Sequence, residues 1–174
     1  NTLFILVSDH GEAWGEHGYY RHPLKLHREL TRVLMMVSGP DLGIDRQLVL
    51  DRVSQVDLVP TILQLLDEPP PEDLDGESLA PLILGEDEIE APRRSLDERT
   101  LFAHTGRLEP IEEHRWSAVT ARWKLIQGMG PVELYDIIND PHEKTNLAGR
   151  HPKVVAQLLE QLKPHKDRIA DLRE

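Results

Sequence analysis

The residues best suited to chemistry lie near the beginning of the sequence, in the segment SDHG at positions 8–11. Asp9 and His10 follow directly after an apolar run, Leu3–Val7. A carboxylate and an imidazole on adjacent residues offer an oxygen and a nitrogen to one cation, which suits Zn²⁺, Mn²⁺ or, with further carboxylates, Ca²⁺. Gly11 permits a sharp backbone turn that lets both side chains face one site. On these residues alone, the alternative interpretation is a turn capped by Asp9 with His10 hydrogen-bonded in the loop.

Two short aliphatic runs, Leu3–Val7 and Val33–Val37, predict strands buried on both faces, as is typical of parallel sheets. In open parallel sheets, ligands bind outside the carboxyl ends of the strands, which is where Asp9 and His10 stand. The expected place for a site is therefore the end of the first strand.

A helix is predicted next, with Asp57 as its N-cap and Pro60 in its first turn. Apolar residues at three- and four-residue spacing give it one hydrophobic stripe, made of Val56, Val59, Ile62, Leu63 and Leu66. The segment LDGESLAPLILG, at positions 74–85, predicts a turn and a second, short helix.

After Arg93 the pattern changes to short apolar runs with polar interruptions, which predict an antiparallel meander. The runs are Leu101–His104, Ser117–Ala121, Lys124–Gln127 and Val132–Ile137. A closing amphipathic helix, with Val155, Leu158, Leu159 and Leu162 on its apolar face, is predicted to stop near Pro164. We therefore divide the chain into an α/β part, residues 1–92, and a small α+β part, residues 93–174.

Composition narrows the functional classes. The chain has 174 residues and a formal net charge of -11, which argues against a nucleic-acid partner because such proteins normally carry a basic face. No apolar stretch approaches the roughly 18 residues that a membrane helix needs. The chain contains no cysteine, which excludes disulfides, thiolate metal sites and a cysteine nucleophile from these residues. Its localisation stays open.

Several segments, taken in their order along the chain, resemble segments of the sulfatase family of the alkaline-phosphatase superfamily. These segments are SDHGEAWGEHG, then His22, RELTRVLMMVSGPDLG, VSQVDLVPTILQLL, LDGESLAPLILG and, far downstream, ELYDIINDPHEKTNLA. The resemblance implies an α/β fold, with part of an alkaline-phosphatase-like sheet sandwiched by helices. A small antiparallel sheet with a C-terminal helix is expected to follow it.

The resemblance also implies roles for individual residues. Asp9 and His10 match the strand-end pair that ligates the family's divalent metal ion, with calcium expected first and manganese or zinc as alternatives. His22 stands where relatives place a residue that contacts the sulfate or phosphate group and assists the leaving group, and an imidazole is suited to that proton transfer. Lys25 is a second candidate for contact with the substrate's anionic group.

The family's nucleophile belongs to a Cys/Ser-x-Pro-x-Arg motif whose cysteine is oxidised to formylglycine, and this motif is absent. Ser38 is followed by Pro40, but Leu42 occupies the position of the arginine. We therefore interpret the chain as the C-terminal half of a larger domain, with formylglycine in the N-terminal half. The chain alone is predicted to be inactive, and the apolar face of Leu3–Val7 is expected to self-associate or to be covered by that half.

The sequence thus favours a fragment of a metal-dependent sulfuric ester hydrolase acting on a sulfate ester substrate. A phosphate or phosphonate ester hydrolase, or a phosphotransferase of the same superfamily, is the alternative within the enzymes. A non-catalytic interaction module is the alternative of another class.

Overall fold

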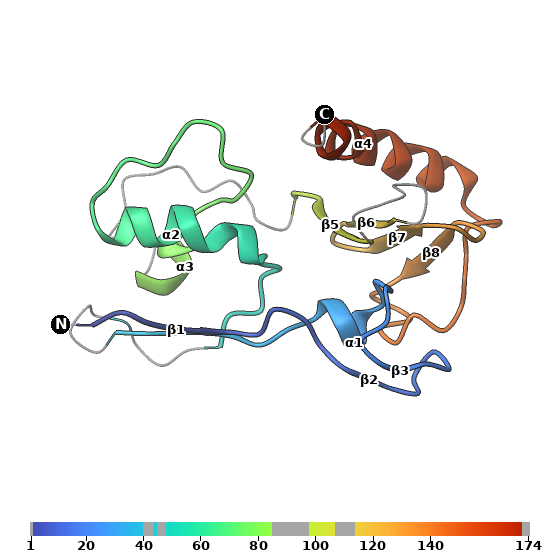
Figure 1. Ribbon diagram of the computed structural model, residues 1–174, viewed down its shortest axis with the longest axis horizontal. Coiled ribbons are helices and arrows are strands. Elements are labelled where there is room, and N and C mark those ends of the chain that lie inside the picture. Colours follow the sequence, from blue (N-terminus) through green and yellow to red (C-terminus); the bar gives the residue numbers. More distant parts are fainter. Residues whose placement is uncertain (1, 40–43, 45–47, 85–97, 107–113, 172–174) are drawn as a thin grey trace. The chain divides into compact units, whose positions relative to one another are not determined.

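The computed structural model describes residues 2–39, 44, 48–84, 98–106 and 114–171. Contacts within the chain divide it into two compact units (Figure 1). The first lies within Asn1–Ser8 and Leu34–Glu98, and the second within Asp9–Val33 and Arg99–Glu174. The boundary predicted between residues 92 and 93 lies outside the described residues. Residues 9–33, predicted as part of the first half, make their contacts within the second unit, and the division into domains stays a prediction.

The first unit contains the strand that leads to the predicted site. Strand β1 (Phe4–Val7) pairs antiparallel with β4 (Met35–Ser38), and Ile5 lies opposite Val37. Residues alternate along both strands, so that Met35 and Val37 pack against the cluster around Leu79 while Phe4 and Leu6 are exposed.

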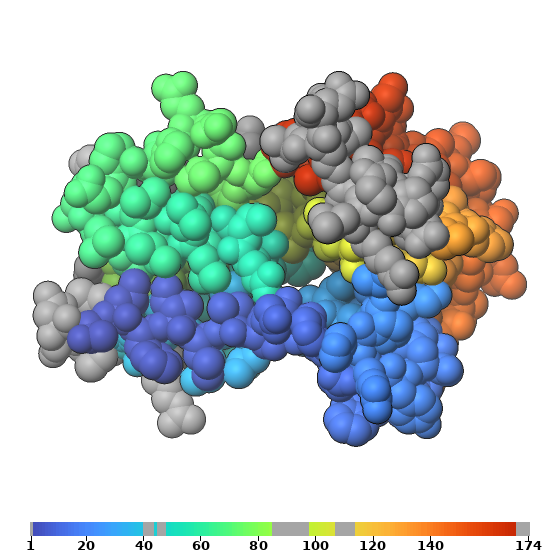
Figure 2. Space-filling view, viewed as in Figure 1, coloured from blue at the N-terminus to red at the C-terminus, as the bar shows by residue number. Residues whose placement is uncertain are grey.

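The expectation of parallel-sheet strands buried on both faces is therefore wrong for this pair. A continuous apolar run does not encode the direction of the neighbouring strand, because the path of the connection sets that direction. The outer face carries Phe4, Leu6 and Met36, which are 59%, 44% and 54% exposed, and β1 forms part of the surface in Figure 2. Self-association through this face stays a prediction.

The two helices predicted for this unit are present. A 3₁₀ turn, η2 (Gln55–Asp57), leads into α2 (Leu58–Leu65), and α3 is the short helix Ala80–Leu84. Asp57 does not cap α2 by itself. It is the N3 residue of the capping box that Ser54 begins, and one of its carboxylate oxygens accepts the Ser54 backbone N–H. Its other carboxylate oxygen accepts a hydrogen bond from the Glu77 backbone N–H at 3.0 Å.

The predicted apolar stripe of α2 is largely exposed. Val56, Val59 and Leu66 are at least half exposed, whereas Pro60 and Thr61 are buried. The hydroxyl of Thr61 accepts the Leu79 N–H at 2.8 Å and thereby joins α2 to the start of α3. The buried side of α2 is therefore polar at its centre, a feature that apolar spacing alone does not reveal.

The second unit contains the predicted meander. Its four antiparallel strands follow one another in chain order: β5 (Leu101–Thr105), β6 (Arg115–Val119), β7 (Trp123–Gln127) and β8 (Glu133–Asp136). Helix α4 (Pro152–Asp171) packs on the sheet through Leu158 and Leu162, which meet Trp116, Ala118 and Leu125 in the core (Figure 1).

Helix α4 does not stop near Pro164, so that detail of the prediction is wrong. Pro164 lies inside the helix, which continues to Asp171. Both Pro164 and Glu160, whose carbonyl loses its intrahelical donor, are exposed. Water can satisfy that carbonyl, and the proline is tolerated for this reason.

Residues 9–33 form the connection that carries the predicted site residues. It contains a short hairpin whose strands have two residues each, β2 (Ala13–Trp14) and β3 (Tyr20–Arg21), and the helical turn α1 (Arg28–Thr31). Among the described residues, no helix is both long and apolar enough to cross a membrane.

Candidate metal and sulfate site

Backbone hydrogen bonds hold the residues that follow β1. The Ser8 N–H donates to the Leu34 carbonyl at 3.1 Å, and the Gly11 N–H donates to the Leu30 carbonyl at 2.9 Å. A Cβ at position 11 would lie 2.0 Å from the Glu29 carbonyl oxygen. Glycine is therefore required here by the close approach of α1, a reason that differs from the sharp turn inferred from the sequence.

Asp9 and His10 both present their side chains to solvent. The side chain of Asp9 is 88% exposed and that of His10 is 47% exposed. The Asp9 Oδ2 and His10 Nε2 atoms are 3.8 Å apart, and the Asp9 Oδ1 atom accepts the His10 N–H at 2.9 Å. The pair thus offers one oxygen and one nitrogen on the same side of the loop.

The structure brings His22 to this pair. The ring centroids of His10 and His22 are 4.7 Å apart, and His22 Nδ1 lies 3.3 Å from Glu12 Oε2. Residues twelve positions apart in the chain are thus gathered at one exposed place. The sequence alone indicated His22 only through the family resemblance.

Lys25 lies in a different electrostatic environment. Its charge acts on Glu133 of β8, whose pKa is held below its usual value first by a hydrogen bond from His27 and then by Tyr135 and the charges of His27 and Lys25. The structure therefore brings Asp9, His10 and His22 close together. Lys25 instead interacts electrostatically with Glu133, the first residue of β8.

A buried network, which the sequence did not reveal, holds the connection to the meander. Lys124 of β7 and Glu143 are 4% and 2% exposed, and Lys124 Nζ donates to Glu143 Oε1 at 2.9 Å. The other oxygen of Glu143 accepts the Arg28 N–H at 3.0 Å, and Lys124 also donates to the Thr31 hydroxyl. Glu143 adopts φ +54, an uncommon conformation for a residue with a side chain.

His17 extends this network, and both of its ring nitrogens face oxygen acceptors. Its Nδ1 lies 2.8 Å from Glu29 Oε1 and its Nε2 lies 2.9 Å from the Glu143 carbonyl oxygen. Both neighbours are acceptors, so both nitrogens must donate. Burial lowers the pKa of His17, but the hydrogen bonds to Glu143 and Glu29 outweigh it and the net pKa is raised.

His27 lies against His17 and completes a second set of polar contacts. The two rings stack with centroids 4.0 Å apart and planes 20° apart. His27 contacts the Tyr19 hydroxyl at 2.9 Å and Glu133 Oε2 at 3.0 Å.

His17, His27 and Glu29 form the one group among the described residues whose three ligand atoms lie within 4.8 Å of one another. Two observations favour a hydrogen-bonding role for this group over metal ligation. Each ring nitrogen already has a polar partner. The rings are nearly parallel, so that their in-plane lone pairs do not converge on one point. Asp9 and His10 remain the candidate metal ligands.

Comparison with known proteins identifies the class. Residues 15–169 match the family described as N-sulphoglucosamine sulphohydrolase, C-terminal, and the chain belongs to this sulfatase family. This confirms the resemblance drawn from the sequence and the alkaline-phosphatase-like α/β fold.

Individual relatives agree with this assignment. Arylsulfatase K of Gallus gallus is 32% identical over 90% of this chain and 30% of its own length. A putative sulfatase from Bacteroides thetaiotaomicron has a TM-score of 0.79 at 25% identity, over 95% of this chain and 36% of that chain. The phosphonate monoester hydrolase of Silicibacter pomeroyi has a TM-score of 0.72 at 25% identity, over 95% and 35%. The chain thus spans about a third of the length of these proteins.

We expect Lys124→Met to lower the free energy of unfolding by about 3–5 kcal/mol, because it leaves Glu143 charged and buried without its partner. The double variant Lys124→Met/Glu143→Leu should be less destabilised than the single one. Urea unfolding measures both, with Lys144→Gln, an exposed neighbour, as the control. Equal losses in Lys124→Met and Lys144→Gln would show that the buried pair does not matter.

Protonated His17 makes stability depend on pH. Its folded pKa is raised above 6.5, so its contribution is complete below pH 6.5 and is lost as the pH rises through the raised value. We expect the protein to lose more unfolding free energy between pH 6 and pH 8 than the variant His17→Gln does. His142→Gln, at an exposed position, should retain the slope of the unmodified protein. A His17→Gln variant with that same slope would contradict the assignment.

Proposed function

We propose that the protein is a metal-dependent sulfuric ester hydrolase in which Asp9 and His10 supply two ligands to a divalent cation. The observation that carries the proposal is the exposed group of Asp9, His10 and His22 at the end of β1. Membership of a sulfatase family supports sulfate esters as the substrate class. Because the chain spans about a third of its relatives, the activity is proposed for a protein that contains it.

The donor set fits such a cation. Asp9 offers a carboxylate oxygen and His10 an imidazole nitrogen, and both are accessible to a ligand. We propose calcium, with manganese or zinc as alternatives that the nitrogen ligand favours. A cation here would neutralise charge on the oxygens of the transferring sulfate group.

His22 and Lys25 are proposed to bind the sulfate group. His22 can carry a proton to the ester oxygen as the leaving group departs, and Glu12 Oε2 lies 3.3 Å from its Nδ1. Lys25 would add a positive charge beside the sulfate oxygens. The nucleophile, formylglycine in this proposal, belongs to residues outside this chain, which contains no cysteine.

Hydrolysis of a phosphate or phosphonate ester is the second candidate. The observation that favours it is the similarity to a phosphonate monoester hydrolase, which covers 95% of this chain, as the similarity to a sulfatase does. A carboxylate–imidazole pair serves either tetrahedral anion. Relative turnover of 4-nitrophenyl sulfate and 4-nitrophenyl phenylphosphonate separates the two.

In a protein that joins this chain to a sulfatase N-terminal half, we expect Asp9→Asn to lower the affinity for the divalent cation at least about tenfold, since a charged ligand is lost. His10→Asn keeps an oxygen ligand, so calcium should be retained better than zinc. Titration with each metal after chelator treatment measures this. Asp73→Asn, at an exposed position in the first unit, is the control. An Asp9→Asn variant that binds like this control would contradict the assignment.

The 174-residue chain by itself should not hydrolyse 4-nitrophenyl sulfate above background, because it holds no Cys/Ser-x-Pro-x-Arg motif. Joined to an N-terminal half with that motif, it should gain turnover that His22→Ala lowers. Turnover by the isolated chain that Asp9→Asn abolishes would overturn this expectation.

A further inference from the structure

Two large aromatic side chains are exposed on the hairpin of β2 and β3, which belongs to the second unit (Figure 1). Trp14 and Tyr20 lie directly opposite each other in the ladder, so both side chains leave the same face of the hairpin. They are 75% and 68% exposed. Tryptophan and tyrosine contribute most to binding when their rings are covered, so this aromatic pair is suited to a ligand.

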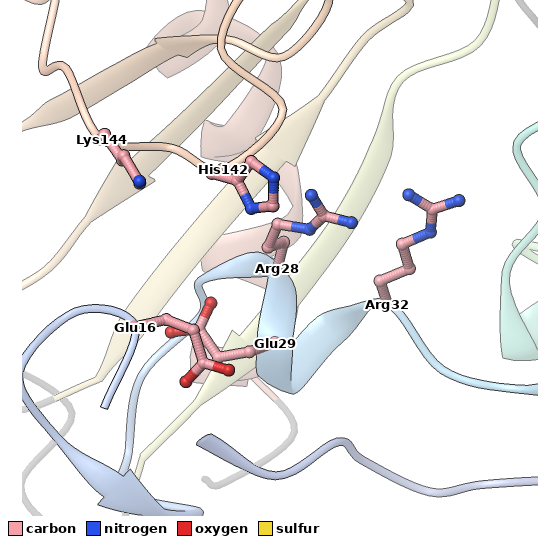
Figure 3. A pocket seen from close by; sticks show the side chains of 6 residues that line it. All are labelled: Glu16, Arg28, Glu29, Arg32, His142 and Lys144. Atoms are coloured by element: carbon pink, nitrogen blue, oxygen red, sulfur yellow. The ribbon is translucent and has the colours of Figure 1, made fainter. Parts of the chain in front are cut away.

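Contacts within the hairpin hold the aromatic pair. The Trp14 N–H donates to Glu16 Oε2 at 2.6 Å, and Glu16 lines, with Glu29, the pocket between α1 and the turn after β8 (Figure 3). A Cβ at position 15 would lie 3.0 Å from the Tyr20 hydroxyl oxygen, so the glycine there leaves room for the end of the Tyr20 ring. Gly15 also has φ +109, which residues with a side chain rarely adopt. The tip of the hairpin is therefore shaped around Tyr20.

The same face of the hairpin carries the His22 end of the proposed site. Ala13 is buried, and because side chains alternate along a strand, Glu12 and Trp14 lie on the side opposite to it. Glu12 Oε2 is 3.3 Å from His22 Nδ1, and the ring of His22 lies against that of His10. Two residues along a strand correspond to about 7 Å. A group bound at His22 is therefore followed, at about that distance, by the aromatic pair.

The carboxylates next to the aromatic pair are engaged within the hairpin. One oxygen of Glu12 lies against His22, and one oxygen of Glu16 accepts the Trp14 N–H. A ring that carries several hydroxyl groups would need polar partners of its own, whereas an aromatic ring needs only apolar surface to pack against. This surface therefore favours an aromatic ring over a hydroxylated one.

We propose that Trp14 and Tyr20 are specificity-determining residues that pack against an aromatic ring in the leaving group of the ester. The inference rests on the proposed function, since it takes the sulfate group to be bound at Asp9, His10 and His22. Offset and edge-to-face contacts between aromatic rings add to the gain from covering their surface. An ester of a small alkyl alcohol would lack that contribution.

Three sulfate esters of primary alcohols test the proposal, because their leaving groups are chemically alike and differ in shape: 2-phenylethyl sulfate, ethyl sulfate and glucose 6-sulfate. In the protein that joins this chain to a sulfatase N-terminal half, we expect Trp14→Ala/Tyr20→Ala to lower kcat/KM for 2-phenylethyl sulfate at least about tenfold. The value for ethyl sulfate should change less than about twofold. Trp14→Phe/Tyr20→Phe keeps two rings and should lower the first value by no more than about threefold.

The matched control is Met129→Ala/Ile138→Ala, which removes two exposed apolar side chains elsewhere in the second unit. It should change kcat/KM for each ester less than about twofold. Equal losses for 2-phenylethyl sulfate and ethyl sulfate in Trp14→Ala/Tyr20→Ala would overturn the proposal. A loss confined to glucose 6-sulfate would do the same, because the ring bound there would then be hydroxylated.

Binding without turnover separates this proposal from the hydrolytic function. In a joined protein whose motif cysteine is replaced by alanine, calorimetry should show 2-phenylethyl sulfate binding at least about tenfold more tightly than ethyl sulfate. Trp14→Ala/Tyr20→Ala should remove that difference. This result, together with no turnover by the unaltered joined protein, would contradict the hydrolytic function and support the aromatic pair. Turnover of ethyl sulfate without any ring-dependent affinity would contradict the aromatic pair and support the function.

Discussion

The buried ion pair between Lys124 and Glu143 is the constraint on which the second unit depends. Two charges withdrawn from water are tolerated only when each is fully hydrogen-bonded, and here the partners come from separate segments. Glu143 reaches α1 through the Arg28 N–H, and Lys124 reaches it through Thr31. The connection over residues 9–33 therefore has one favourable position on the meander.

That position determines where the chemistry lies. Helix α1 is held by the hydrogen bond from the Arg28 N–H to Glu143 and by the contact of His17 with Glu29, and its Leu30 carbonyl accepts the Gly11 N–H. Gly11 follows Asp9 and His10 directly, so these exposed candidate ligands extend from a stretch of backbone held by hydrogen bonds. A rigid buried network that supports an accessible polar loop is a common way to position a functional site.

Local pattern was a good guide wherever neighbours in the sequence decide the structure. The meander and the helices follow from apolar spacing and turn residues. Local pattern gave a wrong prediction where residues far apart in the sequence decide the structure. The antiparallel pairing of β1 with β4 depends on the path of the connection, and the continuation of α4 through Pro164 depends on which side of the helix meets solvent.

The amino-acid sequence alone indicates the family and the order of most elements, and it predicts Asp9–His10 as a metal-ligand pair, because those features lie in short contiguous motifs. The folded chain alone shows that His17 contacts Glu143, 126 positions away, and that His27 contacts Glu133. It also placed Arg28, Arg32 and Lys144 around one pocket. The physical reason is that burial and hydrogen-bond satisfaction depend on which segments pack together, and single-sequence spacing carries no record of that packing.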